Sequence, residues 1–375
     1  MRIGAGAAAL LTVVIMAGVL PAESAQDDSA AKGRGRSEDV LRRREALRER
    51  QEELRRARQA ARRGPMASEP FTAVAKIGRQ GSFNLVNRAG SVTITGSGGD
   101  DVRIEAVKRV WDRSDAAARA ALQDVQIEVT ERQGGVDVRT SVQRPRAIDA
   151  EVDFTIAVPA GASVSVRTGT GDVTVTGVRG ELRAEAVGGG IKATSVGQVR
   201  LLRTLSGAVS LENGDSSDLT ISTLGGPVTI RQLKARSADL RTVAGDLVII
   251  DSEAERLIAQ SLSGRIELTG RLARNGRYSL QSQSGDVRLT PVGSDDFELE
   301  AATVSGSVRS DFPITLDDRQ LTGPPDRGPR LGRGGRGTGR GTGRAGARML
   351  RGVSGSGGPL VTVRSFRGDI TIARR

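Results

Sequence analysis

The stretch QSQSGDVRLT, residues 281–290, contains a glycine that is followed, after one residue, by an alternating Val-Arg-Leu. Nearly the same sequence recurs along the chain. We call the glycine of each copy an anchor glycine. The anchors are Gly90, Gly171, Gly189, Gly207, Gly226, Gly245, Gly264, Gly285, Gly306 and Gly368. From Gly171 to Gly306 the spacing is 18 to 21 residues, and a gap of 62 residues then precedes Gly368. A repeat of nearly constant length predicts a fold built from stacked copies of one structural unit.

Hydrophobicity alternates on both sides of each anchor. The residue two positions after the anchor is aliphatic in every copy: Val92, Val173, Ile191, Val209, Val228, Leu247, Ile266, Val287, Val308 and Ile370. The residue three positions before it is small or polar, as in Thr204, Thr223 and Ser261. Alternation with a period of two predicts strands with one face inward. Each repeat therefore supplies two strands, joined at a bend where a positive φ or a tight corner favours glycine.

These features predict an all-β fold: a single-stranded parallel β-helix, or β-solenoid, of about 18–21 residues per rung. Each rung stacks its aliphatic residues on those of the next, about 4.8 Å away. The usual hand of crossovers between parallel strands predicts a right-handed coil. An antiparallel meander is the alternative, but it does not require a constant period. We expect an N-terminal β-rich cap and a preceding charged helix beside the coil.

The composition restricts the chemistry that the chain can perform. It contains neither cysteine nor histidine, and only one Trp, one Tyr and six Phe among 375 residues. Disulfides, thiolate metal sites and cysteine nucleophiles are excluded, and the commonest general base and zinc ligand is missing. We therefore expect a protein that is not an enzyme and that uses no cofactor.

The N-terminal residues 1–25 have the pattern of a secretory signal peptide. Arg2 precedes an uncharged apolar run over residues 3–20, and small residues follow at Ala22 and Ser24. This pattern predicts export to the periplasm, the outer surface or the medium. The alternative is a segment that stays uncleaved and anchors the protein in the inner membrane, because about 18 apolar residues are close to the length that spans a bilayer.

The net charge of +12 is carried by two segments, residues 26–66 and 323–351. The second is rich in Arg and Gly and too poor in apolar residues to fold, so we interpret it as a disordered insert. Its arginines are candidate contacts for a polyanion: Arg327, Arg330, Arg333, Arg336, Arg340, Arg344, Arg348 and Arg351. For an exported protein such partners are envelope polyanions, acidic polysaccharide or lipid, or another surface protein. No aromatic residue is interleaved for base stacking, so no specific nucleic acid is expected. A solvated loop without a ligand is the alternative.

The remaining chain divides into segments of distinct character. Residues 37–63 predict a solvated helix with opposite charges four residues apart, a coiled coil being the alternative. Residues 71–158 contain a Trp-bearing strand, a short Ala-rich helix and a hairpin at Gly134-Gly135, which together suit a cap over an open solenoid end. Predicted boundaries are 1–25 signal, 26–66 spacer, 67–158 cap, 159–316 solenoid, 317–358 insert and 359–375 terminal rung.

Acidic residues do not predict a catalytic or metal site. Asp295 and Asp296 are the adjacent pair within the coil, and we interpret them as a corner between rungs. Aspartates that follow an anchor occur only in some rungs, at Asp172, Asp246, Asp286 and Asp369, where they suit turns. Tandem calcium repeats have a period half as long, and no phosphate-binding loop follows residues 169–172.

The sequence EVDFTIAVPAGASVSVRTGTGDVTVTGVRGELRAEAVGGGIKA, residues 151–193, with the later phrases SGRIEL, SGDVRL and RGDITI, resembles a known family. It is similar to the bacterial "putative adhesin" domains of unknown function, β-helices with repeated S-G-D-V-x-I rungs. The resemblance covers residues 71–316 and 359–375 and implies surface attachment, with no family active site to transfer.

Together these features predict a non-catalytic, exported module that acts in cell-envelope or surface interactions and is adhesin-like. Two alternatives come from other functional classes: a polysaccharide-active enzyme on a β-helix, and a structural spacer without a specific ligand.

Overall fold

A computed structural model of the chain describes residues 66–143, 149–293, 295–316 and 348–374. The chain divides into two units, Met1–Arg62 and Arg63–Arg375, and all described residues belong to the second. The predicted signal peptide (1–25) and the predicted charged helix (37–63) lie outside the described residues. No helix among the described residues is long and apolar enough to cross a membrane.

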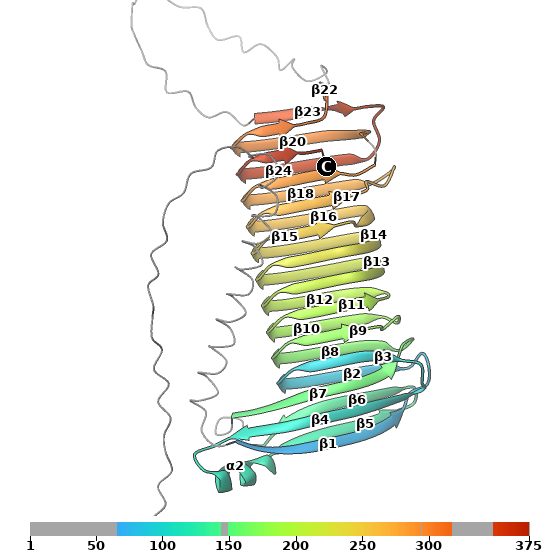
Figure 1. Ribbon diagram of the computed structural model, residues 1–375, viewed down its shortest axis with the longest axis vertical. Coiled ribbons are helices and arrows are strands. Elements are labelled where there is room, and N and C mark those ends of the chain that lie inside the picture. The colour runs from blue at the N-terminus through green and yellow to red at the C-terminus, as the bar shows by residue number, and fades with distance from the viewer. Residues whose placement is uncertain (1–65, 144–148, 294, 317–347, 375) are drawn as a thin grey trace, which may run out of the picture. The chain divides into compact units, whose positions relative to one another are not determined.

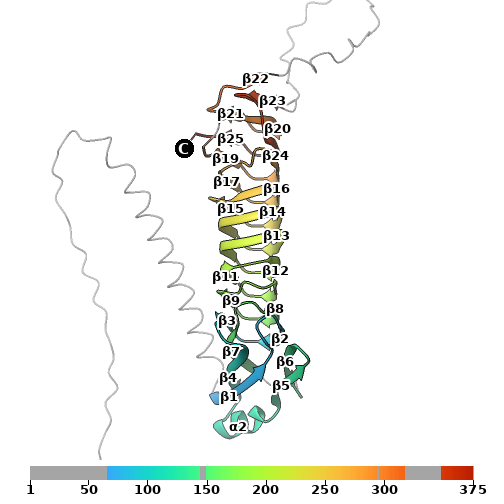
Figure 2. The ribbon, with the colours of Figure 1, turned by 90° about the vertical axis from the view of Figure 1, so that its right-hand side faces the viewer.

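The described chain is mostly β and forms one large mixed, mostly parallel sheet whose strands stack along one direction (Figures 1 and 2). Strands that lead up to an anchor glycine form a first ladder. In spatial order it contains β2 (Ser82–Ala89), β8 (Ser163–Thr170), β10 (Leu182–Gly188), β12 (Val199–Ser206), the second halves of β13 (Val209–Gly225) and β14 (Val228–Ala244), β16 (Glu253–Ser263), β18 (Arg277–Ser284), β24 (Leu360–Arg367) and β20 (Phe297–Ser305). All of these neighbours pair in parallel, as the repeat predicts.

Strands that follow an anchor form a second ladder in the same order. It contains β3 (Val92–Ser97), β9 (Val173–Thr176), β11 (Ile191–Val196), the first halves of β13 and β14, β15 (Leu247–Ile250), β17 (Ile266–Gly270), β19 (Val287–Pro291), β25 (Ile370–Ile372) and β21 (Val308–Ser310). One strand from each ladder makes one rung. The right hand of the coil stays a prediction.

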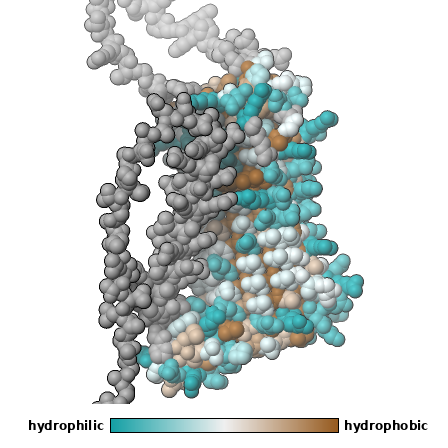
Figure 3. Space-filling model, viewed as in Figure 1, coloured by the Kyte–Doolittle hydropathy of each residue, from teal (hydrophilic) through white to brown (hydrophobic). Residues whose placement is uncertain are grey.

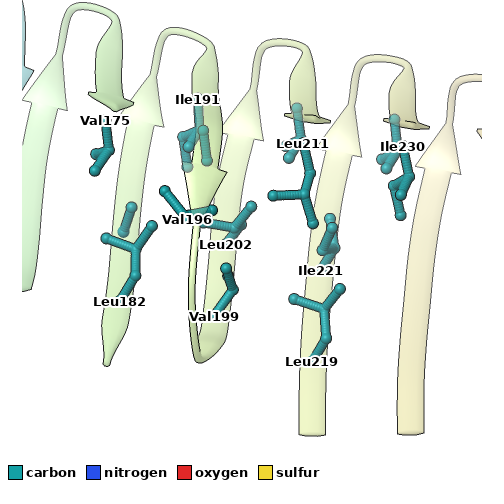
Figure 4. Close-up of a cluster of buried hydrophobic side chains, with 14 of the residues drawn as sticks. Val175, Leu182, Ile191, Val196, Val199, Leu202, Leu211, Leu219, Ile221 and Ile230 are labelled. Carbon is teal, nitrogen blue, oxygen red and sulfur yellow. The ribbon is translucent and has the colours of Figure 1, made fainter. Parts of the chain in front are cut away.

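The pairing places the same repeat position on neighbouring rungs, so the core consists of columns of aliphatic side chains. Ile221 is aligned with Leu202 on one side and with Leu240 on the other, and all three are fully buried. Figure 4 shows these columns between the two ladders. Burying each such side chain stabilises the fold by about 1.5–3 kcal/mol, so a narrow core of Val, Ile, Leu and Ala suffices without bulky aromatics.

The anchor glycines are required mainly because the backbones of neighbouring rungs approach closely at this corner. A Cβ on Gly245 would lie closer than 3.0 Å to the carbonyl oxygen of Gly226, the anchor of the preceding rung. The other anchors from Gly171 onward show the same contact with a neighbouring anchor, and Gly90 meets the carbonyl oxygen of Val152 instead. A positive φ occurs at Gly207 but not at Gly245. The tight corner expected from the sequence is therefore general, whereas the positive φ is not.

Antiparallel strands cover the first end of the stack. β1 (Met66–Lys76) pairs with β4 (Asp101–Trp111), β4 pairs with β7 (Asp149–Pro159), and β7 lies parallel on β3. The predicted hairpin is β5 (Val125–Arg132) with β6 (Gly135–Val142), and β6 lies parallel on β2.

The predicted Ala-rich helix is α2 (Asp115–Leu122), capped by the Ser114 hydroxyl, which accepts a hydrogen bond from the Ala117 N–H at 3.2 Å. Phe83 of β2 and Phe154 of β7 are buried, whereas Trp111 is only half-buried. Trp111 is the last residue of β4 and is aligned with Met66 and Asp149, the first residues of β1 and β7, so it lies at the end of these paired strands.

At the other end, the rung that is last in sequence is not the last layer. β24 and β25 lie between the β18–β19 rung and the β20–β21 rung. The side chains explain this order. Ile370 and Ile372 of β25 are both buried, whereas β21 carries Ser310 where other rungs carry an aliphatic residue. The rung with the polar residue therefore suits the outermost position.

Part of the segment predicted as an insert, residues 317–358, is structured. β23 (Arg348–Ser354) pairs antiparallel with β20 and with β22 (Thr315–Leu316), and so covers the end strand of the first ladder. An open end would leave backbone groups unpaired, which is why these residues are ordered despite their Arg- and Gly-rich neighbourhood.

Candidate functional site

A groove of about 950 Å³ runs along the outer face of the first ladder. Three columns of residues line it, and each column is one position of the repeat. The polar column, four residues before the anchors, contains Arg203, Ser222, Arg241, Gln260, Gln281, Arg364 and Ala302. The hydroxyl column, three residues before them, contains Thr204, Thr223, Thr242, Ser261, Ser282, Ser365 and Thr303. The apolar column, two residues before them, contains Leu205, Leu224, Val243, Leu262, Phe366 and Val304, with Gln283 in one rung.

The alternation of the strands creates these columns. Side chains of the polar and apolar columns point outward, and those of the hydroxyl column point inward between them. Two residues along a strand span about 6.6 Å, which sets the separation between the two banks of the groove. Figure 3 shows one face of the stack, on which residues of similar hydropathy are aligned in columns along the stack.

The hydroxyl column is used by the fold itself. Thr204 donates a hydrogen bond to the carbonyl oxygen of Gly189 at 2.9 Å, and Ser365 donates to that of Gly285 at 3.2 Å. The same contact recurs in Thr223, Thr242, Ser261, Ser282 and Thr303, all of which are buried. These hydroxyls therefore tie each rung to the anchor glycine of its neighbour. The small hydroxyl residues at this position thus serve the corner of the stack.

The apolar column is exposed along its length. Leu205 is 45% exposed, Leu224 53% and Leu262 48%. The sequence analysis missed this column because it considered only the inward positions of the repeat. The signal was present: an aliphatic residue recurs two positions before the anchor, between an inward small residue and the exposed residue that precedes the glycine.

The facing polar column is basic. Arg241 binds Asp239 through two hydrogen bonds of 2.9 and 2.8 Å. Among the described residues, Arg203 and Arg364 take part in no ion pair. No carboxylate of the described chain lines the groove. The groove thus combines an apolar bank with a bank that carries positive charge.

The predicted polyanion contacts lie elsewhere or outside the described residues. Arg327, Arg330, Arg333, Arg336, Arg340 and Arg344 fall in residues 317–347, which the structure does not describe. Arg348 begins β23, and Arg351 in the same strand pairs with Glu300 at 3.3 Å. Arg351 does not line the groove. The insert stays a predicted polyanion contact.

The acidic residues singled out in the sequence hold corners of the stack. Asp172 accepts a hydrogen bond from the Gly190 N–H at 2.8 Å, one rung away, and Asp246 accepts one from the Arg265 N–H at 2.8 Å. Asp295 pairs with Arg374, and Asp296 accepts from the Ser356 N–H, each at 2.8 Å. Within the described residues no group of three or more acidic side chains is placed to hold a metal ion.

Among the residues that the structure describes, two groups have perturbed pKa values, and the contacts of both lie within the fold. A hydrogen bond from Arg183 at 2.7 Å, with Arg200 nearby, lowers the pKa of Glu181. Burial raises the pKa of Tyr278, whose hydroxyl donates to the Ala254 carbonyl and accepts from the Ala273 N–H, both at 2.7 Å. Neither group lines the groove.

The stack of parallel rungs defines a class of repetitive β-protein, and comparison with known families identifies it further. The Toastrack DUF4097 family matches residues 84–323, well over half of the chain. The protein belongs to this family, which confirms the resemblance found in the sequence. None of the curated proteins matches the chain.

Several solved bacterial structures are similar to this chain at low identity. A "putative adhesin" from Bacteroides fragilis is 12% identical, with a TM-score of 0.36, over 82% of this chain and 97% of that one. A "putative adhesin" from Parabacteroides distasonis is 15% identical, with a TM-score of 0.37, over 62% and 92%. A "putative cell adhesion protein" from Clostridium sporogenes is 8% identical, with a TM-score of 0.21, over 82% and 100%.

Proposed function

We propose that the protein is a non-catalytic, exported interaction module of the cell envelope or surface, adhesin-like in its role. The observation that carries this proposal is the exposed apolar column beside a basic bank, on strands that hydrogen-bond rung to rung. Each side chain of the column is fixed at a spacing of about 4.8 Å. A rigid, repeated surface of this kind suits binding, because exposed contiguous apolar patches mark interaction sites.

Retention on bacterial envelope fragments tests this proposal. Full-length protein carrying Leu205→Ser, Leu224→Ser and Leu262→Ser is compared with wild type by co-sedimentation. Val74→Ser is the matched control, since Val74 is 62% exposed on β1, away from the groove. We expect the triple variant to lose retention and the control to keep it. Equal retention of the triple variant and wild type would contradict the proposal, and release of soluble sugars from the fragments would favour the enzyme alternative.

We propose a second contact through the Arg- and Gly-rich insert, with acidic polysaccharide or anionic lipid of the envelope as its partner. Its arginines can neutralise several negative charges at once, which makes such binding salt-dependent. The deletion that tests it removes residues 323–347 only, because Arg348–Ser354 is a strand of the fold. We expect the deletion variant to be retained on anionic liposomes more weakly than wild type and with less dependence on salt. Retention equal to that of wild type would contradict this second contact.

A further inference from the structure

We propose that the groove binds the single acyl chain of an anionic amphiphile, with the chain along the apolar column and the anionic headgroup at Arg203. This inference rests on the proposed function, because it names a ligand for the same groove. It concerns a monomeric amphiphile and not the surface of a membrane.

The apolar bank offers an uninterrupted contact line. Leu205, Leu224, Val243 and Leu262 occupy four consecutive rungs, so the line is about 14 Å long between the outer two. Gln283 interrupts it in the next rung. A flexible hydrocarbon chain can follow such a line and cover the side chains one after another. Covering them removes apolar surface from water, which is the main driving force for binding of this kind.

The floor of the groove argues against a sugar ligand. Sugars are bound through several hydrogen bonds, yet the hydroxyls of the floor already donate to carbonyl oxygens of neighbouring rungs, at 2.9 Å in Thr204 and 3.1 Å in Thr303. The floor therefore consists of the backbone of paired strands, with these side chains turned inward. Phe366 is the aromatic side chain that lines the groove in the described residues. An apolar chain fits this floor better than a polyhydroxylated ring.

The charge of the groove selects the headgroup. Arg203 lies two residues before Leu205 on β12, at one end of the groove, and takes part in no ion pair within the described chain. Its neighbour in register on β10 is Glu185, which pairs with Arg167 at 3.3 Å. Val187 of β10, which is 55% exposed, continues the apolar line one rung beyond the groove. An exposed guanidinium presents paired donors that match a carboxylate or a phosphate. Arg364 is the other arginine without an ion pair, but it lies beyond Gln283, past the far end of the apolar line.

The size of the groove distinguishes a small ligand from a protein. About 950 Å³ is within the range of small-molecule sites. A second copy of the chain would have to bury about 800 Å² on each partner, which a single column of side chains does not supply. It would also bring the basic bank of one copy near that of the other.

Binding of cis-parinaric acid, a fluorescent long-chain carboxylate, to the full-length protein without vesicles is the direct test. Competition with laurate, dodecanol and acetate then separates the contributions of chain and charge. We expect saturable binding, displacement by laurate, weaker displacement by dodecanol, and none by acetate. Leu224→Ser with Leu262→Ser is expected to weaken binding by about tenfold or more, because two apolar contacts are lost. Val74→Ser serves as the control.

The headgroup position is tested in the same assay. Arg203→Gln is expected to weaken laurate binding by roughly tenfold and to leave dodecanol binding unchanged. Arg364→Gln is expected to change the affinity for laurate or for dodecanol by less than about twofold. Both variants are exposed substitutions, and circular dichroism checks that they fold.

Any of three results would overturn the inference. These are no saturable binding of the monomeric probe, equal binding by the Leu224→Ser, Leu262→Ser variant and wild type, and binding seen only with anionic vesicles. If envelope retention still depends on the apolar column while the probe does not bind, the proposed function survives and only the amphiphile is excluded. A concentration-dependent dimer that the Leu224→Ser, Leu262→Ser change abolishes would identify a second copy as the occupant instead.

Discussion

The inner and outer columns of the first ladder contain the same residue types but serve different purposes. Leu240 and Val243 lie three residues apart on β14; the first is fully buried and the second is 39% exposed. The inner column is buried and holds successive rungs together, whereas the outer column leaves apolar surface exposed to water. The difference shows that a periodic strand can build a core on one side and a binding surface on the other with one short repeat.

The largest expected effect comes from truncating the inner column. Leu240→Ala is expected to lower the free energy of unfolding by about 2–5 kcal/mol, because it leaves a cavity between Ile221 and Ala259. Val243→Ala, three residues away, is expected to change it by less than about 0.5 kcal/mol. Urea unfolding followed by circular dichroism measures both. Similar losses in the two variants would contradict the distinction between the columns.

The next largest loss of stability is expected from a substitution at the anchor-glycine corner, where the strand of the first ladder meets that of the second. Gly245→Ala is expected to destabilise the protein by about 1–3 kcal/mol, because the added methyl group meets the Gly226 carbonyl oxygen of the neighbouring rung. Gly225→Ala is the control, since its nearest neighbour would be the Leu205 carbonyl oxygen at 3.8 Å, an ordinary contact. Thermal unfolding compares the two variants. A Gly245→Ala protein as stable as the Gly225→Ala protein would show that the corner is looser than described.

The hydroxyl column gives a smaller effect. Thr204→Val removes the hydrogen bond to the Gly189 carbonyl and is expected to cost about 1 kcal/mol. Thr220→Val, at an exposed position of β13, changes the same atoms without removing a contact to a neighbouring anchor. The difference between their unfolding free energies isolates the hydrogen bond. If the two variants are equally stable, the hydroxyls do not tie the rungs together.

The smallest effect is electrostatic and lies on the outside of the stack. Because Arg183 and Arg200 lower the pKa of Glu181, its contribution to stability is present above the pKa of the unfolded chain and is lost as the pH falls through the folded value. The ion pairs are exposed, so the contribution is expected to stay below about 1 kcal/mol. Unfolding at pH 7 and pH 3 should show a smaller pH-dependent loss in Glu181→Gln than in wild type. An equal or larger loss in Glu181→Gln would be inconsistent with this pairing.

The sequence predicted the parts of the fold that repeat. A constant spacing of the anchors and in-phase aliphatic residues such as Val228 and Leu247 suffice to predict parallel stacking. The order of the last rungs could not be predicted in this way, because Ile370 matches the repeat equally well at any layer. Ser310, the one polar residue four positions after an anchor, explains the order only once the end of the stack is seen.

The candidate site was predicted less well than the fold. The clustered charge of the insert predicted its arginines as contacts, and of these only Arg348 and Arg351 lie in described strands. The apolar column was readable at Leu205, Leu224 and Leu262, but whether an outward aliphatic residue stays exposed depends on what packs over it. The sequence of a single strand does not contain that information, which requires the three-dimensional arrangement.

The order in which the rungs stack aligns the columns that form the groove, so this order is the feature to test. The chain has no cysteine, so introduced pairs report neighbours directly. Gln281 is aligned with Arg364, which in turn is aligned with Ala302. Cysteines at 281 and 364 are about 4.8 Å apart, within reach of a disulfide, whereas those at 281 and 302 are two layers apart. Mild oxidation is predicted to crosslink the 281–364 pair and not the 281–302 pair; efficient crosslinking of 281 to 302 would contradict the account.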